Sequence, residues 1–256
     1  MAEPVGEPAL EAAPLSRRDR VRAETFNEIK QTARRVLVDQ GVDGIALRAV
    51  AREMGLTAPA LYRYFDSRED LVEHVVADLY GELTDVLEAA RDAAVPSSPG
   101  FRLLETARAF RAWATTHHAE FGLLFGSAAE RVIDPAELHG DGDRPAQVAG
   151  QRFGGVFAEL VARIYLERGF PVPADDDLDP ALQEQLRTWC AKLPVALPLG
   201  VMSVFLSCWI RLYGMVCMEV FGHLRFALDD AAPMFENELR SLGEVLGVVE
   251  EYRPPS

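Results

Sequence analysis

The spacing of apolar residues is the feature that most constrains this chain. Where apolar residues recur regularly they fall three or four positions apart, as at Phe153, Val156, Phe157 and Leu160. This period places them along one face of an α-helix, and that face must be covered by another element. The period-two alternation of a half-buried strand occurs nowhere over a useful length. The sequence therefore predicts an all-α fold.

Glycines, prolines and capping residues set the bounds of the expected helices. A first helix covers residues 23–38 and stops before Gly41. Ser67 and Asp70 predict a capping box at the start of a long helix that ends near Ala94. Further helices are expected at residues 101–118, 145–168, 180–192, 198–222 and 233–247. Residues 127–150 show little apolar period, and we expect a loop there.

Two short helices, at residues 48–54 and 58–65, follow the first one. Gly55 between them supplies the positive φ that a tight turn needs, Thr57 is a suitable N-cap, and Pro59 is tolerated in a first turn. Together with the preceding helix and its basic start, they match the helix-turn-helix plan, in which the last helix enters the major groove of DNA.

The net charge is unevenly distributed along the chain. The whole chain carries −14, but residues 14–65 hold ten Lys or Arg against six Asp or Glu, so that this stretch is +4 and the rest is −18. A phosphate responds to the local charge, because salt limits the reach of the field to about 10 Å. The acidic balance of the chain therefore does not exclude nucleic acid as a partner.

The sequence lacks the patterns of common catalytic and metal sites. It has no Gly-rich phosphate loop, Ser nucleophile elbow or paired Cys and His signature. His117 and His118 are adjacent and so point to different faces of a helix, which argues against a metal site that includes Glu120. We therefore expect no enzymatic activity, cofactor or metal, and an enzyme is the main alternative from another functional class.

The N-terminus and the cysteines indicate the compartment. Residues 1–11 lack the basic and apolar segments of a signal peptide, and Cys190, Cys208 and Cys217 form no CxxC pair. We therefore expect a cytoplasmic protein.

One stretch, residues 193–210, is uncharged and reaches the lower limit of length for a membrane span. Pro194 and Pro198 interrupt it, and this favours a buried helix. A helical membrane-associated or carrier protein is the alternative that this stretch leaves open.

Residues 41–71 carry a more specific pattern. The whole segment from Gly41 to Leu71 closely resembles the N-terminal signature of the TetR (tetracycline-repressor-like) family of transcriptional regulators. Its most specific part is Leu61-Tyr-Arg-Tyr-Phe65 followed by Ser67-Arg-Glu-Asp-Leu71. The resemblance is strong over residues 22–75. A second, weaker likeness runs from Trp209 to His223, which looks like the Trp…Gly…Glu (WHG-type) segment of a C-terminal subclass of that family.

The resemblance implies a DNA-binding regulator, most simply a repressor that binds a pseudo-palindromic operator as a homodimer and is released by a small apolar effector. A helix-turn-helix domain would cover residues 17–67, and a helical ligand-binding and dimerisation domain residues 68–256. Dimerisation would use the last two long helices, 198–222 and 233–247. The composition of residues 1–16, rich in Ala, Pro and Glu, predicts a disordered arm.

The residues expected to contact DNA follow from the match. Arg48 corresponds to a base-contact position, since Arg can bind guanine O6 and N7 together, and Tyr64 and Arg68 correspond to phosphate contacts. The full set is Arg17, Arg18, Arg48, Thr57, Ala58, Pro59, Ala60, Tyr62, Arg63, Tyr64 and Arg68.

The same region contains a core and one departure from the family. Ala46 stands where the family usually has Ser or Thr, so the second helix lacks a side-chain cap, at a cost of about 1 kcal/mol, and one expected DNA contact is lost. The residues expected to form the core are Leu47, Val50, Ala51, Leu56, Leu61 and Phe65.

An effector pocket is expected among the C-terminal helices, because pockets are lined mainly by apolar and aromatic side chains with a few polar groups. The candidate lining residues are Trp113, His117, Phe121, Phe125, Phe157, Trp189 and Trp209. For each of them ordinary core packing is the alternative.

Overall fold

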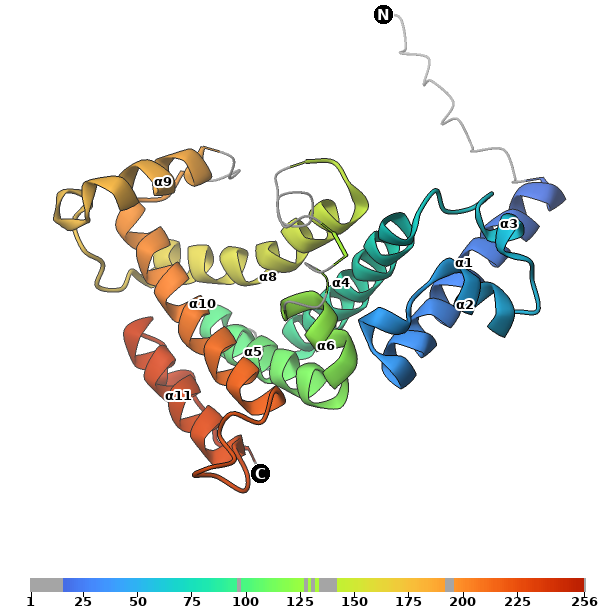
Figure 1. Cartoon of the computed structure of the whole chain (residues 1–256). Helices are drawn as coiled ribbons and strands as arrows, with labels where there is room; N and C mark the ends of the chain where they lie inside the picture. The colour runs from blue at the N-terminus through green and yellow to red at the C-terminus, as the bar shows by residue number, and fades with distance from the viewer. Residues whose placement is uncertain are drawn as a thin grey trace, which may run out of the picture. The chain divides into compact units, whose positions relative to one another are not determined.

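The computed structural model describes residues 16–95, 98–126, 129, 132–133, 142–191 and 196–255, and these contain helices and turns but no strand (Figure 1). The all-α prediction is confirmed. Two compact units meet in the sequence between Leu71 and Val72. This division lies a few residues after the expected boundary at residue 67, because the start of the long helix packs with the first unit.

The first unit is a small helical domain. It holds α1 (Arg17–Gln40), a 3₁₀ turn (Val42–Gly44), α2 (Leu47–Glu53), α3 (Ala58–Leu61) and the start of α4 (Arg68–Ala93). The rings of Phe26 and Phe65 stack with centroids 4.6 Å apart. The remaining core comes from every element, namely Ile29, Ala33, Val36, Leu37, Val42, Ile45, Leu47, Val50, Ala51, Leu61 and Leu71.

The second unit is a larger helical assembly. Its described helices after α4 are α5 (Pro99–Thr116), α6 (His118–Phe125), α8 (Pro145–Arg168), α9 (Pro180–Cys190), α10 (Leu199–Val220) and α11 (Ala232–Val245), with 3₁₀ turns at Asp175–Asp177 and Val249–Glu251. Helix α5 packs against α8, α10 and α11, and α10 and α11 lie side by side (Figure 1).

An aromatic cluster forms the centre of the second unit. Phe110 of α5 is fully buried and meets five other rings at centroid distances of 5.7 to 6.2 Å. These rings come from α6, α8 and α10 and belong to Phe121, Phe125, Phe153, Phe157 and Trp209. The cluster fixes α5 against three neighbouring helices.

Several helix bounds differ from expectation for local reasons. Helix α1 begins at Arg17 rather than at residue 23, because the Ser16 hydroxyl accepts a hydrogen bond from the Asp19 N–H at 3.2 Å and caps the helix. The helix expected at residues 101–118 breaks at His117, whose φ of −124° and ψ of 54° are not helical, and α6 follows.

Two expectations lie mainly outside the described residues. Residues 1–15 of the predicted arm are among them, and Ser16, counted in that arm, caps α1. Of the loop expected at residues 127–150, residues 145–150 are helical in α8, which corrects that part of the prediction, and much of the rest falls outside the described part of the chain.

Helix α10 is, within the described residues, the one helix long and apolar enough to cross a membrane. Its two charged residues are both paired with neighbouring helices of the second unit. Arg211 contacts Glu238 of α11 at 2.6 Å, and Glu219 contacts Arg111 of α5 at 2.6 Å. Pro198, expected to interrupt the apolar run, is the N-cap of α10, so that the helix itself contains no proline. The ion pairs favour packing of α10 within the domain.

Candidate nucleic-acid interface and apolar cavity

The turn between α2 and α3 is fixed by its glycine. Gly55 has a φ of +67°, and its N–H donates to the carbonyl oxygen of Arg52 at 3.2 Å, while the Leu56 N–H donates to that of Ala51 at 2.8 Å. This is a Schellman motif, which satisfies the free carbonyl groups at the end of α2 and reverses the chain. The predicted helix-turn-helix is therefore present.

The two helix starts differ from what side-chain capping would give. Ala46 is the N-cap of α2 with extended backbone and no side-chain bond, as predicted. Thr57 is the N-cap of α3, also as predicted, but its hydroxyl makes no capping hydrogen bond. At the start of α4, Ser67 Oγ accepts from the Asp70 N–H at 3.1 Å, and the Asp70 carboxylate accepts from the Asp66 N–H, so that only half of the predicted capping box forms.

Most of the predicted DNA-contacting residues have exposed side chains. Tyr62 is 53% exposed, so its side chain is not packed in the core of this unit. The exposed members of the set are Arg17, Arg18, Arg48, Thr57, Pro59, Tyr62 and Arg63, whereas Ala58, Ala60, Tyr64 and Arg68 are half-buried. Arg17 and Arg18 are the first two residues of α1.

Leu56 was expected in the core, and this prediction is wrong. The side chain is 39% exposed, because it follows the reversal at Gly55 and so leaves the buried face of α2. The other five predicted core residues are buried.

Arg68 has an internal role that the sequence did not indicate. Its Nε donates to the carbonyl oxygen of Ile45 at 2.6 Å, and its Nη2 donates to that of Val42 at 2.7 Å. These bonds fix the first residue of α4 to the loop before α2. The guanidinium keeps further N–H groups, and its contact with phosphate stays a prediction.

A groove lies between the N-terminal half of α1 and Tyr64. It is lined by Asp19, Arg22, Ala23, Phe26, Asn27 and Tyr64. The sequence assigned Tyr64 to a phosphate contact, but it did not indicate that Arg22 lies beside Tyr64. Helical spacing could have suggested this, because Arg22 lies four residues before the half-buried Phe26 and therefore on the same side of α1.

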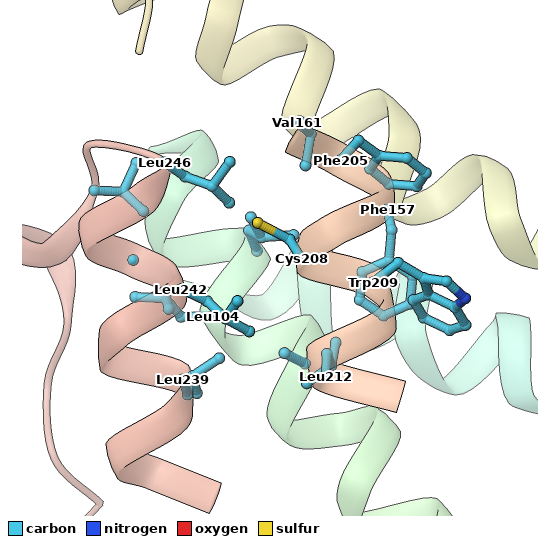
Figure 2. Close-up of a pocket in the computed structure, with 14 residues that line it drawn as sticks. Leu104, Phe157, Val161, Phe205, Cys208, Trp209, Leu212, Leu239, Leu242 and Leu246 are labelled. Atoms are coloured by element: carbon cyan, nitrogen blue, oxygen red, sulfur yellow. The ribbon is translucent and has the colours of Figure 1, made fainter. Parts of the chain in front are cut away.

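The second unit contains an apolar cavity bounded by α5, α8, α10, α11 and the residues that follow α11 (Figure 2). Its volume is about 40 Å³. The lining residues are Leu103, Leu104, Ala107, Phe157, Val161, Phe205, Cys208, Trp209, Leu212, Leu239, Leu242, Gly243, Leu246 and Val248. Burial raises the pKa of the Cys208 thiol to about 11, which reflects how poorly these surroundings solvate a charge.

Of the seven predicted pocket residues, Phe157 and Trp209 line this cavity. Phe121 and Phe125 belong to the aromatic cluster. Trp113 stacks on His117 at 4.8 Å and donates from Nε1 to Glu82, and Trp189 packs on Phe205 at 6.0 Å. Twelve of the fourteen lining residues were not among the candidates. Most of these are aliphatic, such as Leu104 and Leu242, and aliphatic residues on helix faces look like ordinary core.

Comparison with known proteins agrees with this arrangement. The family described as "Bacterial regulatory proteins, tetR family" matches residues 29–75, and the domain described as "Tetracyclin repressor-like, C-terminal domain" matches residues 103–242. The WHG-type likeness remains a prediction. Among the described residues, no group of three or more His, Cys, Asp or Glu side chains is arranged to hold a metal ion.

Relatives of similar length support the same assignment. The chain is 32% identical over 240 residues to the HTH-type transcriptional regulators Rv1816 of Mycobacterium tuberculosis and Mb1846 of Mycobacterium bovis, covering 90% of this chain and 95% of each relative. The solved structure of the putative regulatory protein SCO4313 is 28% identical, covers 89% of this chain and 98% of that one, and superposes with a TM-score of 0.66. The chain belongs to the TetR family of transcriptional regulators.

Proposed function

We propose that this regulator is a ligand-responsive repressor that acts in the cytoplasm, without enzymatic activity, on a pseudo-palindromic operator. The observation that carries the DNA-binding part is the helix-turn-helix itself, with Arg48 and Tyr62 exposed on α2 and directly after α3, while Leu61 between them is fully buried. A buried core that holds exposed base-reading side chains on rigid helices is what major-groove recognition requires.

The contacts with DNA divide into two kinds in this proposal. Arg48 and the small residues Ala58, Pro59 and Ala60 read base edges, because Arg binds guanine and small apolar groups can pack against thymine methyl groups. Arg17, Arg18, Thr57, Arg63, Tyr64 and Arg68 hold the DNA backbone, and Tyr62 contacts a base or a phosphate.

Members of the family bind operators as dimers, and we assign the interface to α10 and α11. Both helices expose apolar side chains outside the core: Ile210 of α10 is 66% exposed, Phe221 after its end 42%, and Met234 of α11 45%. Ile210 and Met218 are eight residues apart, and Phe221 follows three residues later. Their side chains therefore lie on one side of α10 and its C-terminal end. A second copy would remove this surface from water.

The effector site in this proposal is the cavity bounded by α5, α8, α10 and α11, since it is apolar and the proposed dimer helices form two of its walls. A ligand that separates these walls would alter the dimer and hence the spacing of the two DNA-binding domains. Linkage requires the effect to be reciprocal, so an effector that weakens operator binding must bind the operator complex more weakly by the same factor.

This reciprocity provides the test of the proposed function. A small apolar compound that quenches Trp209 fluorescence is titrated into the free dimer and into the dimer on its operator, taken first from DNA next to its own gene. We expect a weaker affinity on the operator, and release of the DNA in a gel-shift assay. Equal affinities in both states for a compound that fills the cavity would contradict ligand-controlled repression.

A further inference from the structure

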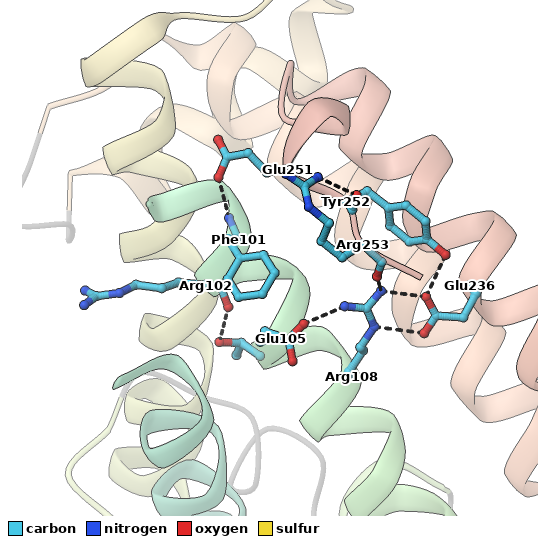
Figure 3. A network of polar contacts seen from close by, with 9 residues as sticks. Phe101, Arg102, Glu105, Arg108, Glu236, Glu251, Tyr252 and Arg253 are labelled. Atoms are coloured by element: carbon cyan, nitrogen blue, oxygen red, sulfur yellow. Dashed lines mark hydrogen bonds and ion pairs between the residues drawn. The ribbon is translucent and has the colours of Figure 1, made fainter. Parts of the chain in front are cut away.

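We infer that residues 248–253, which we call the clasp, are a gate over the apolar cavity, and that the molecule which opens it is an uncharged aliphatic one. The inference deepens the proposed function and rests on it, since it names the class of effector and its route of entry. Figure 3 shows the polar contacts of the clasp with Phe101, Arg108 and Glu236.

The chemistry of the cavity determines the class of ligand. Its walls are aliphatic and aromatic, and the most polar groups along them are the Cys208 thiol and the Trp209 indole. A charge or an unpaired hydrogen-bonding group would lose its water there without finding a partner. The part of a ligand that enters must therefore be hydrocarbon.

The size of the cavity requires a wall to move. Its volume of about 40 Å³ is a few times the ~10–15 Å³ that one water needs on the same measure. A hydrocarbon chain of effector size does not fit without an opening. Val248, which lies in the wall and is 1% exposed, is the lining residue that belongs to the clasp.

The walls differ in what holds them. Phe157 of α8 and Trp209 of α10 are held by ring contacts with Phe110 of α5 at 6.2 and 5.7 Å, which an opening through these helices would break. The clasp is short: it contains one 3₁₀ turn, Val249–Glu251, and its residues 251–253 make polar contacts with α5 and α11. Water can replace the polar partners of the clasp once it opens, and only one apolar lining residue, Val248, moves with it, so the clasp is the wall that opens most easily.

Two sets of polar contacts hold the clasp. In its C-terminal half, the Glu251 carboxylate accepts a hydrogen bond from the Phe101 N–H at 2.7 Å (Figure 3). The same carboxylate accepts a hydrogen bond from the Ser98 hydroxyl at the start of α5 and pairs with Arg168 at the end of α8. The clasp thus joins the ends of two helices that border the cavity.

Near the C-terminal end of the clasp, the Tyr252 hydroxyl donates to Glu236 of α11 at 2.9 Å. The guanidinium of Arg108 on α5 lies over the Tyr252 ring and donates to the carbonyl oxygen of Arg253 at 2.7 Å. Arg108 also binds Glu236 and Glu105, so that one guanidinium connects α5, α11 and the clasp.

Two glycines allow the clasp to close. Gly247 has a φ of +66° and turns the chain back after α11. A Cβ at Gly100 would lie 2.7 Å from the Val248 side chain and 2.8 Å from Glu251, closer than packed atoms tolerate. Gly100 neither lines the cavity nor forms part of the clasp, yet a methyl group there would push the clasp outward.

Gly100→Ala is therefore the variant that tests the gate. The matched control is Gly155→Ala, at an exposed glycine of α8 where a Cβ would meet no atom within 4 Å. The full-length dimer is mixed with 1-decanol in a stopped-flow instrument, and the quenching of Trp209 is followed in a Trp113→Phe/Trp189→Phe background. Far-UV circular dichroism and thermal melting establish that each variant is folded.

We expect 1-decanol to enter Gly100→Ala about tenfold faster or more, because the open state is more populated, and to enter Gly155→Ala at the original rate. Decanoate, which carries a charge, should compete far more weakly than 1-decanol. An unchanged entry rate in a folded Gly100→Ala protein, with 1-decanol bound in the cavity, would overturn the gate while leaving the proposed repressor function intact. Operator release by a polar metabolite, with no binding of 1-decanol to any variant, would overturn the ligand class alone.

Discussion

The Nε of Arg68 donates a hydrogen bond to the backbone carbonyl oxygen of Ile45 at 2.6 Å. The two residues lie at the start of α4 and in the loop before α2, and α2 is the helix that carries Arg48. The first turn of the long helix is therefore part of the DNA-binding unit, which explains why the compact unit ends at Leu71. A residue that the family likeness places at phosphate also holds this unit together.

The first prediction concerns that bond. Arg68→Ala should lower the free energy of unfolding by about 2 kcal/mol, because hydrogen bonds from a charged group contribute roughly 1.5–3 kcal/mol and two carbonyl acceptors lose their donor. Urea denaturation of the full-length protein measures this change. The control, Arg63→Ala at an exposed position, should shift stability by less than about 0.5 kcal/mol. Equal stability of both variants would mean that Arg68 serves DNA alone.

A second prediction follows from the uncapped start of α2. Ala46→Thr should raise the free energy of unfolding by about 1 kcal/mol, since the backbone at Ala46 is already extended as an N-cap requires. The hydroxyl of the introduced threonine would also lie near a DNA phosphate, so we expect the variant to bind its operator more tightly. Thr57→Ala is the comparison, because Thr57 makes no capping bond, and its stability should change little. A larger effect at Thr57 than at Ala46 would contradict this assignment of the caps.

A third prediction separates base contacts from backbone contacts. Arg48→Ala and Tyr62→Ala should each weaken specific operator binding by about 1–3 kcal/mol, and binding to random DNA by much less. Fluorescence anisotropy with labelled operator and random duplexes gives both affinities. Arg163→Ala, at an exposed position of α8, should change neither. If specific and random binding fell together, both residues would be assigned to the DNA backbone.

The salt dependence of binding gives a fourth prediction. Arg63 is exposed and is expected at a phosphate, so Arg63→Ala should reduce the slope of log affinity against log salt by about 0.9 for each protomer. Affinity should fall uniformly over different operator sequences. A slope that stays the same between low and physiological salt would remove Arg63 from the interface.

Local signals account for how much of the DNA-binding domain could be predicted. Gly55, Thr57 and Pro59 fix a turn and a helix start through their own backbone preferences, so the start of α3 was predicted and the bounds of α2 were predicted to within one residue. The end of α3 was predicted wrongly, because the helix stops at Leu61 and residues 62–64 form a turn, whereas the expected helix ran to residue 65. Leu56 was misplaced because its burial depends on how the chain leaves the turn. The bonds of Arg68 join residues 23 and 26 positions apart in the sequence, and no periodicity reports such a contact.

The cavity was less predictable than the helices around it. The apolar period of α8 correctly placed Phe157 on a buried face, but the same period also buries Phe153, which packs in the aromatic cluster. Whether a buried side chain meets another ring or an empty space is decided by the relative positions of four helices. The clasp was not predicted at all, because its residues have no period and are held by partners far away in the sequence.

Footprinting of the protein on its captured operator tests the central claim most directly. Genomic fragments bound by the purified full-length protein are sequenced. The fragment that binds most tightly is probed with hydroxyl radicals, and the mass of its complex with the protein is measured separately. We predict a pseudo-palindromic site occupied by whole dimers, with protected half-sites centred about 34 Å apart, one turn of the duplex, or a multiple of that distance apart. Capture of random sequence with no symmetric protection, or binding by a lone protomer, would contradict the account.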